Sequence, residues 1–311
     1  MDFRYKCFAM QALSRIPFGQ NAHYWIQKHI TKSLKAGDEK YLQMYNAKVR
    51  PHMEAFLNYG NTELQESVYY EFGAGWDLFA PLGFSAYGVK RLILVDLSPL
   101  LHAEEAQNSI DFYRGNAAKL GLPHMPPDVK PLRQNQMEAV LKDVFRIEYN
   151  APLDARNTGF PSDSVDYIVS NATMEHIPGQ DLVAILKECH RLLRAGGVIS
   201  CVIDYQDHWA YFDKSISVYN YLSYEEADWK RYNPPNHYQN RLRHCDYVRL
   251  FQEADFEILR IREKPIREKD RLALDGISVA SRFQSYSQED LLIRGAHIVA
   301  RRAGERIFGA K

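Results

Sequence analysis

Short apolar runs alternate along the middle of the chain with longer segments whose apolar residues recur every three to four positions. Residues 68–72 and 92–95 show the first pattern, and residues 182–193 show the second. Strands that alternate with helices predict an α/β protein built on a doubly wound, mostly parallel sheet of seven strands. The other strands are expected at 144–149, before Asn171, at 198–204, and as an antiparallel final pair at 256–262 and 297–302.

The first 60 residues precede the first predicted strand and have the apolar spacing of helices. Apolar positions mark helix faces at Phe8, Leu13, Ile16, Tyr24, Ile26 and Ile30. We expect residues 1–60 to form a helical cap over a main domain of residues 61–311. Two alternatives stay open: helices that only pack on the outside of the sheet, and contact of the aromatic and basic residues 3–8 with a membrane surface.

Two segments of the main domain are longer than a simple connection between strands requires. The first, residues 98–143, contains a predicted helix at 100–120, a proline-rich loop and a second helix from 134 to 143. We expect it to form a partial lid. The second, residues 204–250, begins where the fifth strand leaves the sheet, which is the edge at which ligands bind in open α/β sheets.

The first predicted strand ends in a glycine turn, and the second ends on a carboxylate. Gly73 and Gly75 form the turn, Glu71 lies two residues before it, and Asp96 follows the second strand. Such an arrangement opens a nucleoside pocket, in which the acid accepts the ribose hydroxyls. A dinucleotide is disfavoured because Leu78 replaces the third glycine and Glu71 would repel a pyrophosphate. The carboxylate suits S-adenosylmethionine, which bears an ammonium and a sulfonium; a plain tight turn is the alternative.

These residues and a downstream set together carry a resemblance to a known family. The downstream set comprises Asp154-Ala155, residues 160–170, Glu175-His176-Ile177 and residues 192–197. Over residues 65–205 the chain resembles the class I S-adenosylmethionine-dependent methyltransferases, in particular the small-molecule, type 11-like group. The resemblance implies a Rossmann-like sheet and a cofactor site made of Glu71, Gly73, Gly75, Asp96, Leu97, Asp154, Ala155 and Asn171.

Composition restricts the partners. The 311 residues are 46% hydrophobic, enough for one large core, and the formal net charge is zero, so no global field would gather nucleic acid. No apolar run has the length needed to span a bilayer. The four cysteines lack zinc-ligand spacing, and Cys189 and Cys201 fall at apolar positions that favour buried free thiols. We therefore expect a cytoplasmic enzyme whose acceptor is a small molecule.

The segment after the fifth strand carries the chemistry expected of an acceptor site. Aromatic faces with polar groups between them suit a polyhydroxylated or ring-shaped molecule, and an O-methylated, sugar-containing acceptor is the preferred prediction. The alternatives are methylation of nitrogen or of a phenol or quinone, a non-catalytic cofactor-binding scaffold, and tyrosines that serve only packing. The candidate acceptor residues are Asp204, Asp207, Tyr211, His237, Tyr238 and Arg241.

Transfer to a hydroxyl requires a group that removes its proton, and histidine is suited to this near neutral pH. The first candidate is His176, since related sugar and quinone enzymes contribute a histidine after the fourth strand; the second is His208. No metal is predicted. In ubiquinone-type relatives a further glutamate helps to bind a divalent ion, and this chain has Ala172 in that place. Glu175 and His176 alone offer too few ligands for a hard cation.

Overall fold

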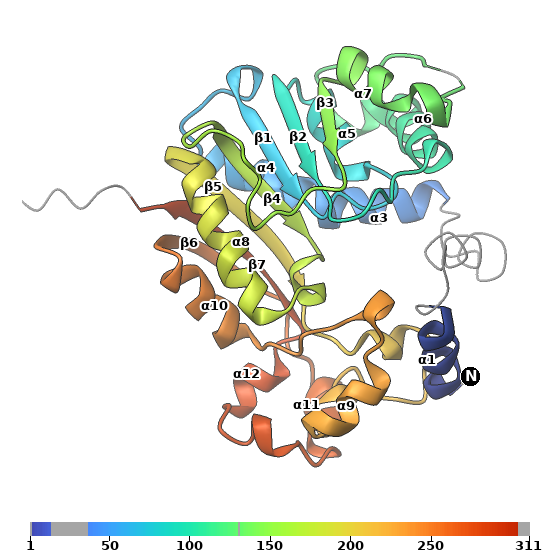
Figure 1. The fold of residues 1–311 in the computed structure, drawn as a ribbon, viewed down its shortest axis with the longest axis vertical. Coiled ribbons are helices and arrows are strands. Elements are labelled where there is room, and N and C mark those ends of the chain that lie inside the picture. The colour runs from blue at the N-terminus through green and yellow to red at the C-terminus, as the bar shows by residue number, and fades with distance from the viewer. Residues whose placement is uncertain (1, 14–36, 130, 304–311) are drawn as a thin grey trace, which may run out of the picture.

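A computed structural model describes residues 2–13, 37–129 and 131–303 (Figure 1). Its centre is a seven-stranded sheet in the order β3-β2-β1-β4-β5-β7-β6, in which β7 alone is antiparallel to its neighbours. The doubly wound sheet with an antiparallel final strand is therefore confirmed. The strands are β1 (Val68–Phe72), β2 (Arg91–Val95), β3 (Ile147–Asn150), β4 (Val165–Asn171), β5 (Leu193–Asp204), β6 (Phe256–Glu263) and β7 (Gly295–Arg302).

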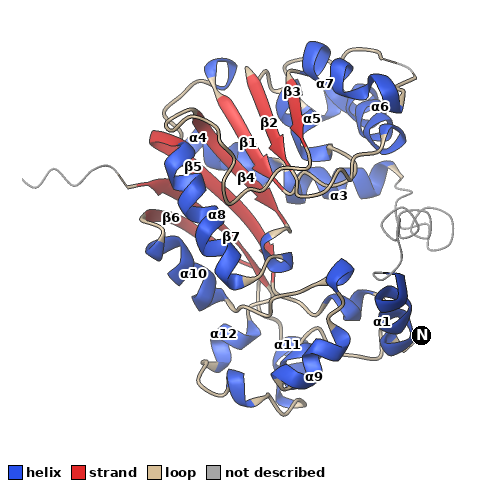
Figure 2. Cartoon of the chain, in the orientation of Figure 1, coloured by secondary structure: helices blue, strands red, loops and turns tan. Residues whose placement is uncertain are grey.

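Helices cover both faces of the sheet because successive side chains of each strand point to opposite sides. In β2, Leu92 and Leu94 join one core cluster, and Ile93 and Val95 join the other. The first face packs on α3 (Asp38–Lys48), α4 (Arg50–Tyr59), α5 (Phe79–Ala86), α6 (Ala103–Leu120) and α7 (Met137–Phe145). The second packs on α8 (Gly179–Leu192) and α10 (His244–Glu253), which lie in front of the strands in Figure 2.

A second lobe lies below the carboxyl ends of the strands and has its own hydrophobic core (Figure 1). It consists of the segment after β5, the connection from β6 to β7, and the first helix of the chain. Its helices are α1 (Phe3–Leu13), α9 (Glu226–Tyr232), α11 (Glu268–Asp275) and α12 (Gln288–Leu292). Short 3-10 helices in the chain include η4 (Met174–His176), η5 (His208–Tyr211), η6 (Asn220–Ser223) and η7 (Pro235–His237).

The expected boundaries shift at two elements. Helix α7 continues to Phe145 and ends at Arg146, which has a positive φ of 60°, so β3 starts three residues later than the predicted strand. Leu193, expected on the apolar face of the preceding helix, is instead the first residue of β5, which runs through Gly196 and Gly197 and begins before the strand expected at 198–204. Backbone pairing with β4 thus overrides the glycines, at the cost of a shift in register between Val165 and Tyr167.

The amino-terminal segment is divided between the two lobes. Helix α1 buries Phe3, Cys7 and Met10 in the second lobe, whereas Phe8, expected on the buried face, is 75% exposed. Helices α3 and α4 pack under the sheet instead. Of the other expected apolar positions, Ile16, Tyr24, Ile26 and Ile30 lie outside the described residues, as does the side chain of Leu13.

The segment between β2 and β3, expected to form a partial lid, is mainly a structural layer. Helices α6 and α7 bury residues such as Ile110 and Leu141 in the core against the sheet. Among the described residues of 98–143, Leu100 alone lines either of the two cavities described below. Its length serves the packing of two helices on one face of the sheet, which apolar periodicity alone does not distinguish from a lid.

Two expectations from composition can be compared with the structure. All four cysteines are free thiols, and Cys189 and Cys201 are fully buried, where desolvation raises their pKa. Among the described helices, none combines the length and apolar character required to cross a membrane.

Candidate active site

Two adjoining cavities open at the carboxyl ends of the central parallel strands. The larger has a volume of about 400 Å³ and lies over the turn after β1; the smaller, of about 290 Å³, lies between β2 and the start of α8. Gly73, Asp96, Thr173 and His176 line both, so they form one continuous depression. Because parallel strands end at the same edge, residues distant in sequence meet here.

The glycine turn brings the backbone up to the larger cavity. Gly73 and Gly75 have φ values of +75° and +72°, a region that strains residues with a Cβ. A Cβ on Gly73 would lie 2.3 Å from the side chain of Thr173, whereas a Cβ on Gly75 would have no atom within 4 Å. The first glycine therefore permits close packing with β4, and the second leaves space for a ligand.

Asp96 is fixed by the backbone beside this turn. One carboxylate oxygen accepts a hydrogen bond from the Gly75 amide at 3.2 Å, and the other accepts one from the Ser98 amide at 3.1 Å. Burial raises the pKa of Asp96, and these amides oppose the shift. A carboxylate oxygen has more than one acceptor site, so both oxygens can also receive a pair of adjacent hydroxyls, as a ribose presents them.

Glu71 supplies a second, deeper carboxylate to the larger cavity. Its oxygens accept hydrogen bonds from the Tyr69 hydroxyl and, at 3.4 Å, from the side-chain amide of Asn171. Burial raises its pKa to about 7, against the opposing effect of these two bonds and of Lys48 on the cavity wall. A ligand that brings a positive charge would hold this carboxyl ionised.

The remaining predicted cofactor residues also lie at the two cavities. Asn171 lines the larger one, and Leu97, Asp154 and Ala155 line the smaller one. All eight predicted residues are thus brought together, although their contact with the cofactor stays a prediction. The sequence interpretation missed Lys48, Trp76 and Arg156, which also line these cavities; Trp76 and Arg156 directly follow the Gly75 and Ala155 of the predicted set, whereas Lys48 belongs to no motif.

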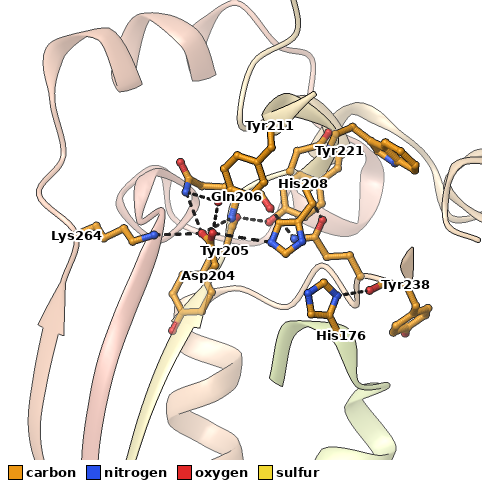
Figure 3. Close-up of polar contacts among 12 residues, drawn as sticks. His176, Asp204, Tyr205, Gln206, His208, Tyr211, Tyr221, Tyr238 and Lys264 are labelled. Atoms are coloured by element: carbon orange, nitrogen blue, oxygen red, sulfur yellow. Dashed lines mark hydrogen bonds and ion pairs between the residues drawn. The ribbon is translucent and has the colours of Figure 1, made fainter. Parts of the chain in front are cut away.

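His176 and His208 come from different segments and lie side by side, with ring centroids 4.8 Å apart (Figure 3). The Nδ1 of His176 is 2.7 Å from the carbonyl oxygen of Tyr238. Since a carbonyl only accepts, Nδ1 carries the hydrogen and Nε2 of the neutral ring is left with a lone pair. Burial lowers the pKa of both, that of His208 to about 4, so both rings are neutral near pH 7.

Asp204 provides the negative charge nearest to this pair. Its carboxylate accepts a hydrogen bond from the Tyr211 hydroxyl, pairs with Lys264 at 3.3 Å and lies 3.9 Å from Nε2 of His208 (Figure 3). Although burial opposes ionisation, these partners hold the pKa of Asp204 below its usual value. The carboxylate therefore stays charged next to two neutral imidazoles.

Glu175 adds a third ionisable group. It is buried, neither of its oxygens has a hydrogen-bond partner among the described residues, and burial raises its pKa to about 8. One ligand atom each from Glu175, His176 and His208 lies within 4.8 Å of the other two. Two imidazoles and a carboxylate are a donor set for a transition-metal ion, which the sequence interpretation did not anticipate. Neighbouring ligands of tetrahedral zinc are ~3.3 Å apart, so a spread of this size would have to contract around an ion.

Of the six predicted acceptor residues, four lie at the histidine pair. Asp204 and Tyr211 lie beside His208, and Tyr238 binds His176 through its backbone. His237 packs its ring on Trp209, with centroids 4.4 Å apart, and its ring centroid is 6.2 Å from that of His208.

Asp207 and Arg241 do not reach an acceptor surface. Asp207 is fully buried, begins η5 by accepting the Trp209 amide and binds Asn220. Arg241 is 1% exposed and donates to the carbonyl oxygens of Tyr221 and Tyr224. Both side chains are engaged by the fold, because a short lobe with many turns needs internal partners for its backbone groups.

The tyrosines of this segment are also more structural than expected. Tyr219 and Tyr221 are fully buried, and their hydroxyls donate to the carbonyl oxygens of Leu292 and Tyr205 at 2.9 and 2.6 Å. The packing alternative therefore applies to them, while Tyr211 at 44% exposure retains an accessible ring.

The cavity fits a nucleoside donor with a cationic amino-acid end. Space remains in front of Gly75, Asp96 offers oxygens for ribose hydroxyls, and Glu71 is a buried carboxylate whose pKa is raised in the absence of a cation. Residues 132–201 match a family model described as a methyltransferase domain, a segment that contains Asp154, Asn171 and His176. No curated protein matches the chain.

Several solved structures are similar to this chain at low identity. An S-adenosylmethionine-dependent methyltransferase from Methanosarcina mazei is 17% identical, with 80% of this chain and 97% of that chain covered and a TM-score of 0.44. A putative methyltransferase from Bacillus halodurans is 15% identical, with coverages of 82% and 100% and a TM-score of 0.42. Geranyl diphosphate C-methyltransferase from Streptomyces coelicolor, solved with Mg²⁺, geranyl diphosphate and S-adenosylhomocysteine, is 13% identical, with coverages of 82% and 79% and a TM-score of 0.42.

Likenesses with TM-scores below 0.5 carry no weight in the assignment. It rests on the order of the strands with an antiparallel β7, the glycine turn followed by Asp96 at the edge of the sheet, and the match of residues 132–201 to the methyltransferase domain. Residues 132–201 therefore match the methyltransferase-domain family, and the sheet around them has the topology of a Rossmann-like methyltransferase fold.

Proposed function

We propose that this methyltransferase acts on a hydroxyl of a small, polar, sugar-containing acceptor. The observation that carries the proposal is the pair of neutral imidazoles, His176 and His208, with His176 on the wall of both cavities. A methyl transfer to a neutral amine has less need of such a pair. A hydroxyl of an alcohol has a pKa far above neutrality, so it requires a base as the methyl moves.

The residues of this chain then have separate roles in cofactor binding and proton transfer. When bound, the cofactor supplies the activated methyl group. Glu71, Asp96 and the glycine turn would hold the cofactor. Nε2 of His176 takes the proton of the acceptor hydroxyl. His208 and Asp204 stabilise the charge that appears on His176. Holding both reactants in line is worth more than any single group, because it replaces a bimolecular encounter.

The acceptor would lie between the cavities and the second lobe. Tyr211 and the backbone of Tyr238 border His208 and His176 there, and Asp204 adds a charged acceptor of hydrogen bonds. An accessible aromatic ring beside a charged carboxylate favours an acceptor ring with several hydroxyls. We also propose that the protein works in the cytoplasm, a reducing compartment that agrees with four free thiols.

The test is methylation with labelled S-adenosylmethionine over a panel of nucleotide sugars, glycans, phenols and amines. The proposal expects transfer to a sugar hydroxyl at a rate above that of every amine and phenol. Transfer only to nitrogen, to a phenol or quinone, or to carbon would replace the proposed acceptor. Cofactor binding without transfer to any class would favour a non-catalytic scaffold.

A further inference from the structure

A chain of hydrogen bonds crosses the sheet behind the larger cavity and ends on Glu71. His297 in β7 contacts Ser200 in β5, with Nε2 2.7 Å from Oγ. Ser200 Oγ is also 2.7 Å from Nδ1 of His52 in α4, whose Nε2 is 2.9 Å from Oδ1 of Asn171. Asn171 then donates to Glu71. His52, Ser200 and His297 line neither cavity, and no sequence motif contains them.

The direction of each bond follows from the chemistry of the groups. Oδ1 of Asn171 only accepts, so Nε2 of His52 carries the hydrogen and Nδ1 has the lone pair. Nδ1 therefore accepts the hydroxyl hydrogen of Ser200, and the Ser200 oxygen accepts from Nε2 of His297. The Nδ1 of His297, left bare by this tautomer, has no partner among the described residues. Every donor in the chain thus points toward Glu71.

The opposite direction of these hydrogen bonds would require a protonated Glu71. If His52 donated through Nδ1, its bare Nε2 would need the amide group of Asn171, and the Asn171 carbonyl oxygen would then face Oε1 of Glu71. Two acceptors can share that position only when Glu71 carries a proton. The direction of the chain and the charge of Glu71 are therefore linked.

Burial keeps the rings of His52 and His297 uncharged. His52 and Ser200 have no exposed surface, and burial lowers the pKa of His52 to about 4 and that of His297 to about 2. Both rings are neutral at physiological pH and contribute orientation instead of charge. Tyr69 acts on Glu71 through its hydrogen bond, the charges of Lys48 and Asp77 also act on Glu71, and Glu71 in turn raises the pKa of Tyr113.

We propose that His52, Ser200 and His297 are positioning residues, which hold Asn171 and Glu71 as oriented acceptors for the cationic amino-acid end of S-adenosylmethionine. Hydrogen bonds that all run toward one carboxylate favour its ionised form and fix its direction before the cofactor arrives. This inference rests on the cofactor site alone and is independent of the acceptor.

The first test compares two ligands of the full chain by calorimetry. S-adenosylhomocysteine retains the amino-acid end, whereas 5′-methylthioadenosine lacks it. Ser200→Ala should lower the affinity for S-adenosylhomocysteine about five- to thirtyfold, which is the effect of one lost buried hydrogen bond. The affinity for methylthioadenosine should stay within about twofold of wild type. Ser109→Ala is the matched control, because Ser109 is also fully buried but its hydroxyl has no partner among the described residues; it should change neither affinity.

The pattern of losses separates the possible failures. Equal weakening of both ligands would mean that the chain only supports the fold, and unchanged affinity for both would mean that it has no role; either overturns the proposal. Failure of wild type to bind either ligand would instead refute the cofactor site. The affinity of wild type for S-adenosylhomocysteine should fall below about pH 7, where Glu71 gains a proton, and in Ser200→Ala this fall should begin at higher pH.

The second test needs no variant to fold. In ¹⁵N-labelled wild type, imidazole nitrogen shifts distinguish protonated from bare nitrogens, and His52 and His297 should both be in the Nε2–H form above pH 7.5. Finding His52 in the Nδ1–H form would reverse the chain and contradict the inference. As the pH falls through 7, a change of tautomer at His52 that follows the protonation of Glu71 would support their linkage.

Discussion

At the scale of single residues, the site depends on a few atoms placed where the backbone leaves no freedom. Asp96 is held by two amides, and Gly75 faces open space with a positive φ. Neither residue belongs to a hydrophobic core cluster, so a change at either acts first on the turn and the cavity. The two positions therefore test cofactor binding separately from folding.

Replacement of Asp96 by alanine should lower the affinity for both S-adenosylmethionine and S-adenosylhomocysteine. Charge-assisted hydrogen bonds are worth about 1.5 to 3 kcal/mol each, so a loss of ten- to a hundredfold is expected. Gly75→Val should lower the affinity further. The valine side chain would occupy the space for the ligand, and a residue with a Cβ is strained at the positive φ of this position. Calorimetry checks both; an Asp96→Ala protein that binds like wild type would refute the role of this carboxylate.

The histidine pair makes a second prediction at this scale. His176→Ala should lower the single-turnover rate on a hydroxyl acceptor by about a hundredfold to ten-thousandfold, with donor affinity little changed. Loss of His208 should cost less if it only assists. The rate of wild type should rise with pH through the lowered pKa of His176, because the base must be neutral.

The same assay decides whether a metal takes part. We expect a chelator to leave the rate unchanged, since the site is proposed to work through imidazole alone. A rate that is lost with chelator and restored by zinc or manganese would assign Glu175, His176 and His208 as ligands instead. If His176→Ala and the double variant His176→Ala/His208→Ala keep near-wild-type rates, catalysis depends only on holding the two reactants together.

At the scale of elements, the second lobe is tied together by contacts between segments far apart in sequence. Arg243 is fully buried and donates to the carbonyl oxygens of Tyr205, Leu291 and Ile293 at 2.8, 2.8 and 2.6 Å. Helix α1 docks beside these segments through Phe3, whose amide donates to Asp213 at 2.9 Å and whose ring packs on Trp209. The lobe therefore needs the amino terminus to complete its core.

Phe3→Ala should detach α1 and loosen this lobe. Loss of a buried aromatic ring typically costs about 3 to 5 kcal/mol, here reduced because α1 lies at the edge of its core. Limited proteolysis and hydrogen exchange should show increased opening in residues 205–243, while affinity for S-adenosylhomocysteine stays within twofold. Tyr5→Ser, on the exposed side of the same helix, is the control and should change neither. A large loss of donor affinity in Phe3→Ala would show that α1 also supports the cofactor site.

At the scale of the whole molecule, stability depends on buried ionisable groups that have no partner. Glu175 is the clearest case, because burial raises its pKa to about 8 and its oxygens have no hydrogen-bond partner among the described residues. A carboxyl whose folded pKa exceeds its unfolded value contributes stability below the unfolded pKa, and this stability is lost as the pH rises toward the folded pKa.

Glu175→Gln should remove that dependence. Between pH 4.5 and 8 the wild type should lose stability relative to the variant, with a difference of about 2 to 4 kcal/mol at pH 8.5. Denaturant unfolding at several pH values measures it. His52 and His297 act in the opposite sense, because their lowered pKa values remove stability as the pH falls below 6.5. An unchanged pH profile in Glu175→Gln would show that its carboxyl is solvated or paired in solution.

The sequence by itself determined the sheet, the glycine turn and the eight residues around the cofactor cavities. Strands, turns and helix faces are local patterns with fixed periods, and the carboxyl ends of parallel strands must share one edge. The positions of Glu71, Asp96 and Asn171 at the ends of three such strands are therefore enough to predict that they lie together.

Only the tertiary structure decided which polar residues are free to act. Arg241 and Asp207 resemble ligand-binding residues in the sequence, but backbone groups of the second lobe engage them: Arg241 donates to the carbonyl oxygen of Tyr221, and Asp207 accepts from the amide of Trp209. His52 and His297 belong to no motif, and they meet because α4 and β7 pack on either side of Ser200. Burial and the direction of a hydrogen bond depend on neighbours as far as 148 residues away along the chain, so no local pattern records them.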